Sequence, residues 1–332
     1  MKIAVIGPGA IGGLVAGYLK HRGEDVFLVG RKEAVEAISK NGFEISGTRG
    51  DLKIKIDIVP KLGKKVDLAI LTVKTQDIEK VIKENLAYLK NTIILTTQNG
   101  IQADKILAKY FSEEKIISSI VMFGSTYLGL NKIVHNFEGK WIIGRPFMKN
   151  DTKAEEIAVF LNKIFPVITT DDIAGMKWLK VFVNANNCLP ALIGKSMQET
   201  FSNSELCKLS MRIWQEGLAI ITKVGIKLVS LPDFPLERLE KLAALPLDES
   251  AKIFSGIMMN LSKEPLYGSI LQSIKRNRLS EIDYINGAFV ALAKEHSICA
   301  KLNGKLVELV HTVEKSKRFL DVKELIEKTK GL

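Results

Sequence analysis

The chain opens with a short apolar run followed at once by a glycine-rich turn, and this order constrains the fold more than any other feature. Residues 2–6 read Lys-Ile-Ala-Val-Ile, residues 7–12 read Gly-Pro-Gly-Ala-Ile-Gly, and a helical pattern follows. Strand, glycine turn and helix in that order are the context that a dinucleotide-binding GxGxxG motif requires. In such a motif Gly7 permits the tight turn, Gly9 lets the backbone approach a pyrophosphate, and Gly12 lets the helix pack close to the strand.

The turn as a whole is therefore the predicted dinucleotide-binding element, because the free N–H groups of the helix that it opens attract phosphates. Its residues are Gly7, Pro8, Gly9, Ala10, Ile11 and Gly12. The alternative is a glycine-rich turn without a ligand.

Length and composition favour a globular chain of two domains with a sizeable core, since 332 residues are 46% hydrophobic. No apolar stretch reaches the roughly 18 residues of a membrane span, and the chain begins almost inside its first strand, so we expect no signal peptide. The three cysteines, Cys188, Cys207 and Cys299, form no CxxC motif, which indicates a reduced, cytoplasmic protein. The histidines form no metal-binding motif, so no metal site is expected.

The net charge of +11 is unusual, and it suits either nucleic acid or the steering of anionic small molecules. The lysines are spread along the chain as solvated faces and no nucleic-acid-binding motif accompanies them. We therefore expect a small-molecule partner and neither nucleic acid nor a membrane.

Apolar runs and helical patterns alternate through the first half of the chain. The expected strands are 3–6, 26–29, 67–73, 93–97 and 116–122, and the helices between them are 10–22, 31–39, 77–89 and 104–111. Segments 43–45 with 54–59, and 132–136 with 141–143, read as antiparallel pairs. This alternation predicts a Rossmann-type, doubly wound α/β sheet.

Helices dominate from about residue 155. The expected helices are 155–164, 174–193, 203–224, 236–244, 248–260, 267–275, 281–296 and 302–315. Four prolines within 227–267 predict short, interrupted helices there. The chain is thus expected to divide into a Rossmann-like dinucleotide-binding domain, residues 1–169, and an all-helical substrate-binding domain, residues 170–332.

The end of the second strand sets the choice of dinucleotide in this fold, because an acidic residue there holds the ribose of NAD and a basic one accommodates the 2′-phosphate of NADP. Arg31 and Lys32 stand at that place and no acid does, which predicts NADPH/NADP. Two alternatives remain: both cations merely begin an exposed helix, or Glu33, one residue further, reaches a ribose.

Polar residues also follow the third and fourth expected strands, where ligands bind in this architecture. Lys74 and Gln76 follow the strand at 67–73, and Asn99-Gly100 follows the strand at 93–97. Asn99 can both donate and accept hydrogen bonds, which suits a nicotinamide ribose or a substrate oxygen. For Asn99-Gly100 a simple turn is the alternative.

A lysine lies amid apolar residues in the helix expected at 174–193. Such a lysine either extends its amine to water or is desolvated for a purpose. Lys180, Asn184 and Asn187 fall on one helical face, because Asn184 and Asn187 are each within about 40° of Lys180. An ammonium and two amides on one face suit a polar substrate, whereas a structural role is the alternative.

The last candidate segment is the start of the helix expected at 281–296. Ile282, Ile285, Phe289 and Leu292 form its apolar stripe, and Glu281 lies at the stripe's edge. Ser280 is a plausible N-cap, so Glu281 and Asp283 either bind a ligand or only complement the helix dipole.

Together these motifs resemble the ketopantoate reductase (2-dehydropantoate 2-reductase) family over residues 1 to about 315. The matching features are the glycine turn, Lys74, Asn99-Gly100, Lys180 with Asn184, and Ser269 twelve residues before the segment Glu-Ile-Asp-Tyr-Ile-Asn-Gly at 281–287. The resemblance implies reduction of the C2 ketone of 2-dehydropantoate by NADPH, giving (R)-pantoate on the way to pantothenate and coenzyme A.

The resemblance also assigns roles to these residues. Lys180 would be the general acid that protonates the developing alkoxide, and Glu281 would hold the substrate hydroxyl and set the field around Lys180. Asn184 would orient the carbonyl and Ser269 would bind the carboxylate. Asn99 and Lys74 would lie beside both cofactor and substrate, and Glu281 would also contact the cofactor.

Two departures from the family pattern bear on the substrate pocket. Cys188 stands where the family often has a second asparagine, and we hypothesise that Asn187 replaces it. The segment 227–268 also looks longer than in compact members. The alternatives are therefore a reductase of a different 2-keto acid, or a dinucleotide-binding sensor without turnover. The helices after residue 281 pack either on a second copy, forming a homodimer, or only on their own domain.

Overall fold

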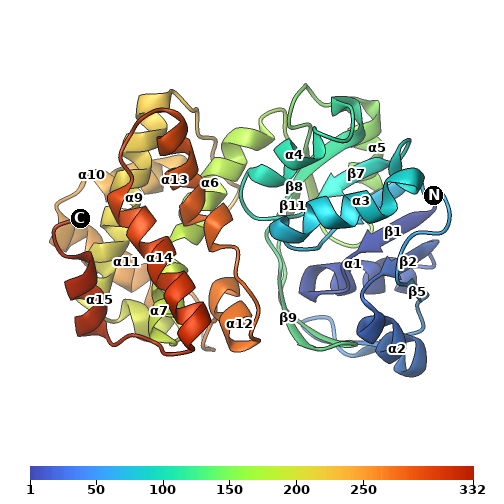
Figure 1. The fold of residues 1–332 in the computed structure, drawn as a ribbon, viewed down its shortest axis with the longest axis horizontal. Helices are drawn as coiled ribbons and strands as arrows, with labels where there is room; N and C mark the ends of the chain where they lie inside the picture. The colour runs from blue at the N-terminus through green and yellow to red at the C-terminus, as the bar shows by residue number, and fades with distance from the viewer. Residues whose placement is uncertain (263) are drawn as a thin grey trace. The chain divides into compact units, whose positions relative to one another are not determined.

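The computed structural model describes residues 1–262 and 264–332, and these form two compact units, Met1–Ala174 and Gly175–Leu332. Among these described residues, the strands all lie in the first unit, and the second unit is helical (Figure 1). This α/β architecture, with a parallel sheet and a helical C-terminal region, confirms the predicted fold class.

An eight-stranded sheet forms the centre of the first unit, with strand order β12-β11-β8-β7-β6-β1-β2-β5. Its strands are β1 (Ile3–Ile6), β2 (Val26–Val29), β5 (Ile58–Val59), β6 (Leu68–Leu71), β7 (Ile93–Thr96), β8 (Ile116–Val121), β11 (Trp141–Gly144) and β12 (Val167–Thr169). From β5 to β8 all neighbours are parallel, and their order is the 3-2-1-4-5-6 order of a dinucleotide-binding sheet. The strand order reverses between β1 and β6.

Helices cover both faces of this sheet because alternate residues of its strands point to opposite sides. Ile3 and Val5 pack on one face with α1 (Ala10–His21), α2 (Lys32–Asn41) and α5 (Thr152–Leu161). Ala4 and Ile6 pack on the other face with α3 (Ile78–Leu89) and α4 (Gln102–Leu107). Both faces are therefore buried, which explains the continuous apolar runs of the strands.

The pairing predicted for 43–45 with 54–59 is only partly right. A separate four-stranded sheet, β4-β3-β10-β9, contains β3 (Phe43–Gly47) and β4 (Leu52–Ile54) as an antiparallel pair, whereas residues 58–59 join the main sheet as β5. The sheet is completed by β9 (Gly124–Gly129), which the sequence reading missed, and β10 (Lys132–Phe137).

The predicted antiparallel pairing of 132–136 with 141–143 is wrong. β10 pairs with β9 and β3, while β11 pairs with β8 and β12 in the main sheet. The burial patterns give the physical reason, since all four residues of β11 are buried whereas β10 alternates between buried and exposed positions. A fully buried strand belongs in a sheet that is covered on both faces.

In the described part of the second unit, the regular structure is helical apart from an isolated bridge between Leu231 and Phe234. Its helices are α6 (Ile173–Ala185, which begins two residues before the unit does), α7 (Cys188–Ile193), α8 (Met197–Phe201), α9 (Ser204–Val224), α10 (Leu236–Ala244), α11 (Leu247–Met259), α12 (Ser269–Lys275), α13 (Asn286–Glu295), α14 (Lys301–Ser316) and α15 (Val322–Thr329). The expected interruption within 227–267 is present, because Pro235 and Pro246 are the N-cap residues of α10 and α11. Lys263 of this segment lies outside the described residues.

Two helices expected to be continuous are broken. The helix at 174–193 divides into α6 and α7 at Asn186–Asn187, and the helix at 281–296 divides into a 3₁₀ turn, η3 (Ile282–Tyr284), and α13. The sequence reading also missed α8 and α15. Both breaks fall within segments that carry predicted site residues, so they bear directly on the geometry described next.

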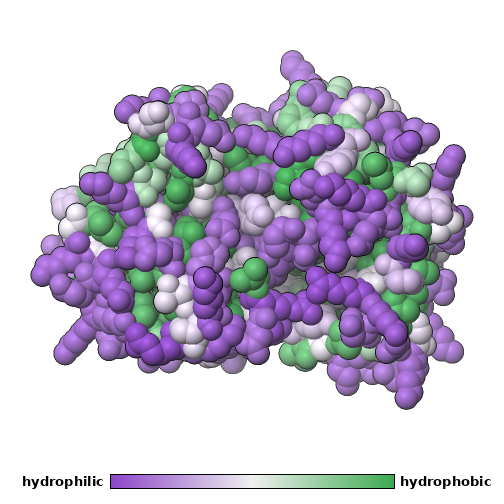
Figure 2. Space-filling model, viewed as in Figure 1, coloured by the Kyte–Doolittle hydropathy of each residue, from purple (hydrophilic) through white to green (hydrophobic). Residues whose placement is uncertain are grey.

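Polar side chains cover much of the visible surface (Figure 2). Among the described residues, no helix is sufficiently long and apolar to cross a membrane, and no group of three or more His, Cys, Asp or Glu side chains is arranged to hold a metal ion. Cys188, Cys207 and Cys299 are free thiols.

Candidate functional site

The glycine turn has the geometry that its three glycines predict. Gly7 has a φ of +111°, a left-handed conformation that favours glycine. A Cβ on Gly12 would lie 2.1 Å from the carbonyl oxygen of Gly7 and 2.2 Å from Thr72 Oγ1, so only glycine allows this close approach. A Cβ on Gly9 would meet nothing within 4 Å, which means that the space above this residue is open.

The N-terminus of α1 presents backbone donors without a competing side chain. Gly9 is its N-cap and provides no side-chain cap, and the first turn contains no acidic residue. Pro8 packs against Gly30 after β2, because a Cβ on Gly30 would lie 2.7 Å from Pro8 Cγ. Free N–H groups, the positive end of the helix dipole and open space above Gly9 suit a pyrophosphate.

Arg31 and Lys32 follow β2 at the same edge of the sheet. Their side chains are 72% and 86% exposed. Arg31 lies 3.5 Å from Asp77, and Lys32 lies 3.9 Å from Glu36. Exposed ion pairs of this kind contribute little to stability. Both cations are therefore accessible to an anionic ligand.

Gln98 joins the loops that carry Lys74 and Asn99. Its buried Nε2 donates to the carbonyl oxygens of Leu71 at 2.9 Å and Val73 at 2.7 Å. Lys74 is the N-cap of the 3₁₀ turn η1 (Thr75–Asp77), one residue after Val73, and Asn99 follows Gln98 directly. The two loops are therefore held side by side at the carboxyl ends of β6 and β7. The sequence reading missed Gln98, although its place directly before Asn99-Gly100 was a signal.

Thr72 is a second residue that the sequence reading missed. Its Oγ1 donates to the carbonyl oxygen of Gly7 at 2.7 Å and also lies 3.0 Å from that of Ile6. The end of β6 thus supports the glycine turn. In the first unit, four candidate features follow strands at one edge of the sheet: the glycine turn, Arg31, Lys74 and Asn99. They lie on both sides of the point between β1 and β6 where the strand order reverses.

In the second unit, Lys180 and Asn184 lie on a narrow stripe of α6. From residue 175 to residue 185 every position is buried except Met176, Lys180, Val183 and Asn184. Their spacing of about four residues places them on one face of the helix. Lys180 is half-buried, and burial lowers the pKa of its ammonium group from the ordinary value to about 8.

Asn187 lies beyond the end of α6, so the predicted helical face does not extend to it. Asn187 is the N-cap of α7, and its N–H donates to the carbonyl oxygen of Asn184 at 3.0 Å. Its side chain reaches Gly268 instead, because a Cβ on Gly268 would lie 3.4 Å from Asn187 Cβ. Ser269, exposed at the start of α12, is the next residue, so Asn187 and Ser269 are neighbours through Gly268.

Glu281 lies on a turn rather than within a helix. It is partly exposed and immediately precedes η3, while Ile282 and Ile285 are fully buried beside it. The N-cap of η3 is Glu281 and not Ser280 as predicted, although the oxygen Oγ of Ser280 accepts from the N–H of Ile282 at 3.3 Å. The helix that follows packs on α6, with ring centroids of Phe182 and Phe289 4.8 Å apart.

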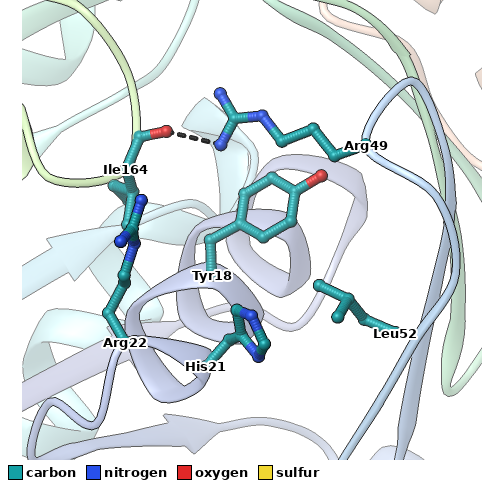
Figure 3. Close-up of a pocket in the computed structure, with 6 residues that line it drawn as sticks. All are labelled: Tyr18, His21, Arg22, Arg49, Leu52 and Ile164. Atoms are coloured by element: carbon teal, nitrogen blue, oxygen red, sulfur yellow. Dashed lines mark hydrogen bonds between the residues drawn. The ribbon is translucent and has the colours of Figure 1, made fainter.

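A hollow of about 290 Å³ lies elsewhere in the first unit and contains none of the predicted site residues (Figure 3). It is lined by Tyr18, His21, Arg22, Arg49, Leu52 and Ile164. Arg49 donates to the carbonyl oxygen of Ile164 at 2.7 Å and to Glu138 at 2.6 Å, so its guanidinium is already engaged. The hollow adjoins the C-terminus of α1, where the helix dipole disfavours an anion.

Comparisons with known proteins match almost the whole chain. Family models described as "Ketopantoate reductase PanE/ApbA" and "Ketopantoate reductase PanE/ApbA C terminal" match residues 3–146 and 172–314. A 2-dehydropantoate 2-reductase of Pyrococcus horikoshii is 30% identical over 95% of this chain and 98% of its own. The chain belongs to the ketopantoate reductase family. The family resemblance drawn from the sequence is thus confirmed, and the protein is an oxidoreductase.

Other similar proteins cover nearly the whole chain as well. A 2-dehydropantoate 2-reductase of Archaeoglobus fulgidus is 26% identical over 94% of this chain and 98% of its own. A ternary structure of D-mandelate dehydrogenase with NADH and anilino(oxo)acetate superposes with a TM-score of 0.82, at 26% identity over 95% of this chain and 99% of the other. A PanE/ApbA family ketopantoate reductase from Ralstonia eutropha has a TM-score of 0.81 at 22% identity, over 96% and 99%, which supports the fold.

Proposed function

We propose that this ketopantoate reductase family member is a 2-dehydropantoate 2-reductase that uses NADPH. The reaction would give (R)-pantoate and serve pantothenate and coenzyme A biosynthesis. The observation that carries the proposal is the half-buried Lys180, with a pKa of about 8, on one stripe with Asn184. Residues 1–169 would bind NADPH and residues 170–332 would bind the keto acid.

The residues of the first unit fit a dinucleotide. The open space above Gly9 and the uncapped N-terminus of α1 suit the pyrophosphate. The accessible cations of Arg31 and Lys32 suit the 2′-phosphate that distinguishes NADPH from NADH. When bound, NADPH supplies a hydride from C4 of its nicotinamide ring. Lys74 and Asn99 would contact the cofactor, and Asn99 also the substrate.

Lys180 would supply the proton. Hydride addition to C2 leaves a negative charge on the former ketone oxygen, and Nζ of Lys180 would donate a proton to that oxygen, forming the hydroxyl group. The neutral amine would then recover a proton from water. A donor with a pKa of about 8 is largely protonated at neutral pH yet gives up its proton readily. Its charge would also stabilise the alkoxide as it develops.

The remaining polar groups of the second unit would hold the substrate. Asn184 would orient the ketone, Ser269 would bind the carboxylate, and Glu281 would accept a hydrogen bond from the substrate hydroxyl and set the field at Lys180. The position of Asn187 beside Gly268 supports its proposed role as the replacement for the asparagine that the family often has at position 188.

A second candidate function is the reduction of a different 2-keto acid. The similarity to D-mandelate dehydrogenase favours it, because the ternary structure of that enzyme contains NADH and anilino(oxo)acetate. The same proton donor and glycine turn would serve either substrate, so the difference would lie in the pocket around the substrate side chain and in the response to the 2′-phosphate.

A kinetic screen tests both candidates. Purified protein would be mixed with NADPH or NADH and with 2-dehydropantoate, benzoylformate or pyruvate, and cofactor oxidation would be followed by absorbance. The proposal predicts the highest kcat/KM for 2-dehydropantoate with NADPH. Turnover of benzoylformate without turnover of 2-dehydropantoate would favour the second candidate. Tight NADPH binding without turnover of any acid would instead indicate a dinucleotide sensor.

A further inference from the structure

The turn that carries Glu281 is held by a buried carboxylate from another helix. Oε1 of Glu314, on α14, accepts a hydrogen bond from the N–H of Ser280 at 2.7 Å. The side chain of Glu314 is 3% exposed, and the bond is buried. A buried carboxylate is costly unless it is well paired, and Glu314 is paired with Ser280 of this turn and with His311.

A histidine also links Glu314 to the turn. Nδ1 of His311 lies 2.9 Å from Oε2 of Glu314, and Nε2 of the same ring lies 2.9 Å from Oδ1 of Asp283. Asp283 belongs to η3, two residues after Glu281. One imidazole thus bridges a carboxylate of α14 and a carboxylate of the turn. We call Glu314, His311 and Asp283 the clamp.

The clamp needs a charged imidazole. Carboxylates only accept hydrogen bonds, whereas a neutral imidazole has a single N–H donor. Both contacts of His311 are therefore hydrogen bonds only when the ring is protonated. The charged groups that act on the ring are Asp283 and Glu314; burial opposes its charge, but the hydrogen bonds to these carboxylates outweigh burial and raise the pKa of His311. Burial likewise opposes the charge of Glu314, and the bonds from Ser280 and His311 lower its pKa.

Apolar and amide contacts fix the rest of the turn. Ile282 and Ile285 are fully buried, and η3 packs on α14. Beyond the turn, Nδ2 of Asn286 donates to Oδ1 of Asn303, also on α14, at 2.9 Å. Glu281 lies between Ser280 and Ile282, both of which are buried and hydrogen-bonded. Little freedom is left to the backbone from which the Glu281 side chain extends.

We propose that Glu314 and His311 are positioning residues that hold Glu281 in the orientation in which it meets the substrate. This inference rests on the proposed function, since it takes Glu281 as a ligand-binding group. Neither residue need touch the substrate. A misplacement of about 1 Å in a binding group can reduce catalysis by up to about 100-fold, so loosening this turn is expected to be visible in the kinetics.

The first test measures local opening of the turn and does not depend on activity. Hydrogen exchange at the N–H of Ser280 would be followed in the wild type, in Glu314→Ala and in Glu308→Ala. Glu308 lies on the same helix and pairs with Lys305, so it is the matched control. We expect exchange at Ser280 to accelerate by about 10-fold or more in Glu314→Ala only, as loss of a charged acceptor predicts. Unchanged exchange in Glu314→Ala would overturn the inference.

The second test measures positioning. Glu314→Gln keeps an acceptor for Ser280, and His311→Ala removes the bridge from a half-exposed site; both are expected to fold. We expect kcat/KM for the keto acid to fall about 10-fold in His311→Ala below the pKa of His311. The difference in kcat/KM between His311→Ala and the wild type should shrink as the pH rises, because His311 of the wild type then loses its proton and one of its two hydrogen bonds. His296→Ala, at an exposed histidine, is the control.

A purely structural clamp predicts a different result. If His311→Ala and Glu314→Gln are less stable but keep the wild-type kcat/KM at every pH, the inference is overturned. Failure of the proposed function is distinguishable, because the wild type itself would then consume no NADPH with any 2-keto acid.

Discussion

Alanine substitutions within the glycine turn are expected to separate effects on NADPH affinity from effects on stability. Gly9 has extended backbone angles, φ −84° and ψ −163°, and a Cβ there would meet nothing within 4 Å. Gly9→Ala is therefore expected to leave the free energy of unfolding unchanged or to raise it by about 0.5 kcal/mol, because the unfolded chain loses freedom. The new methyl group occupies the space through which a pyrophosphate would approach the backbone. We expect NADPH affinity to fall about 10- to 100-fold, which corresponds to about 1.4–2.7 kcal/mol.

Gly12→Ala is expected to lower the free energy of unfolding, in contrast to Gly9→Ala. Its Cβ would lie 2.1 Å from a backbone carbonyl oxygen, about 1.3 Å inside the 3.4 Å at which ordinary contact begins. The helix or the end of β6 must move, and overpacking of this kind costs about 1–3 kcal/mol. Gly63→Ala is the control, because a Cβ there meets nothing within 4 Å and Gly63 lies far along the chain from the turn.

The assay is urea unfolding together with NADPH titration for all three variants. The reasoning predicts normal stability with weak binding for Gly9→Ala, low stability for Gly12→Ala, and wild-type values of both for Gly63→Ala. Wild-type NADPH affinity in Gly9→Ala would refute the proposed dinucleotide site. Wild-type stability in Gly12→Ala would refute the packing argument.

Three further predictions concern the cofactor, the proton donor and the pocket. Arg31→Ala should reduce the preference for NADPH over NADH about 10-fold, as loss of a phosphate contact does; an unchanged ratio in steady-state kinetics would contradict this role. Because the pKa of Lys180 is lowered to about 8, its acid form is lost as the pH rises through that value, so kcat for reduction should fall above about pH 8 while the reverse oxidation should speed up. A pH-independent kcat would exclude Lys180 as the donor. Asn187→Ala should raise KM more than Asn186→Ala does, and equal effects would remove Asn187 from the pocket.

Local patterns were sufficient to predict most of the helices and strands. The run at residues 3–6 and the glycine turn after it specify a buried strand and a helix start, and the structure has both. Pairing depends on partners far along the chain, and there the prediction failed. Residues 141–143 look like the return strand of a hairpin, yet the complete burial of β11 places it beside β8 in the main sheet.

The candidate site likewise combines features that local sequence predicts with features that depend on distant contacts. Residue types and spacing are sufficient to predict the stripe of Lys180 and Asn184, because a helical period is a local property. The break at Asn186–Asn187, which sends Asn187 toward Gly268, depends on packing between α7 and α12. Glu314 was not predicted either, because in sequence it looks like any charged residue of a long helix. Its burial and its bond to Ser280 exist only once α14 packs on the turn.

The central claim is that this family member reduces a 2-keto acid with Lys180 as the proton donor. The most direct measurement is kcat for 2-dehydropantoate with NADPH at pH 7 in the wild type and in Lys180→Ala, with NADPH affinity measured on both proteins. We predict turnover by the wild type and a kcat at least about 100-fold lower in Lys180→Ala, with NADPH binding preserved. A variant that binds NADPH and turns over 2-dehydropantoate at nearly the wild-type rate would contradict the account.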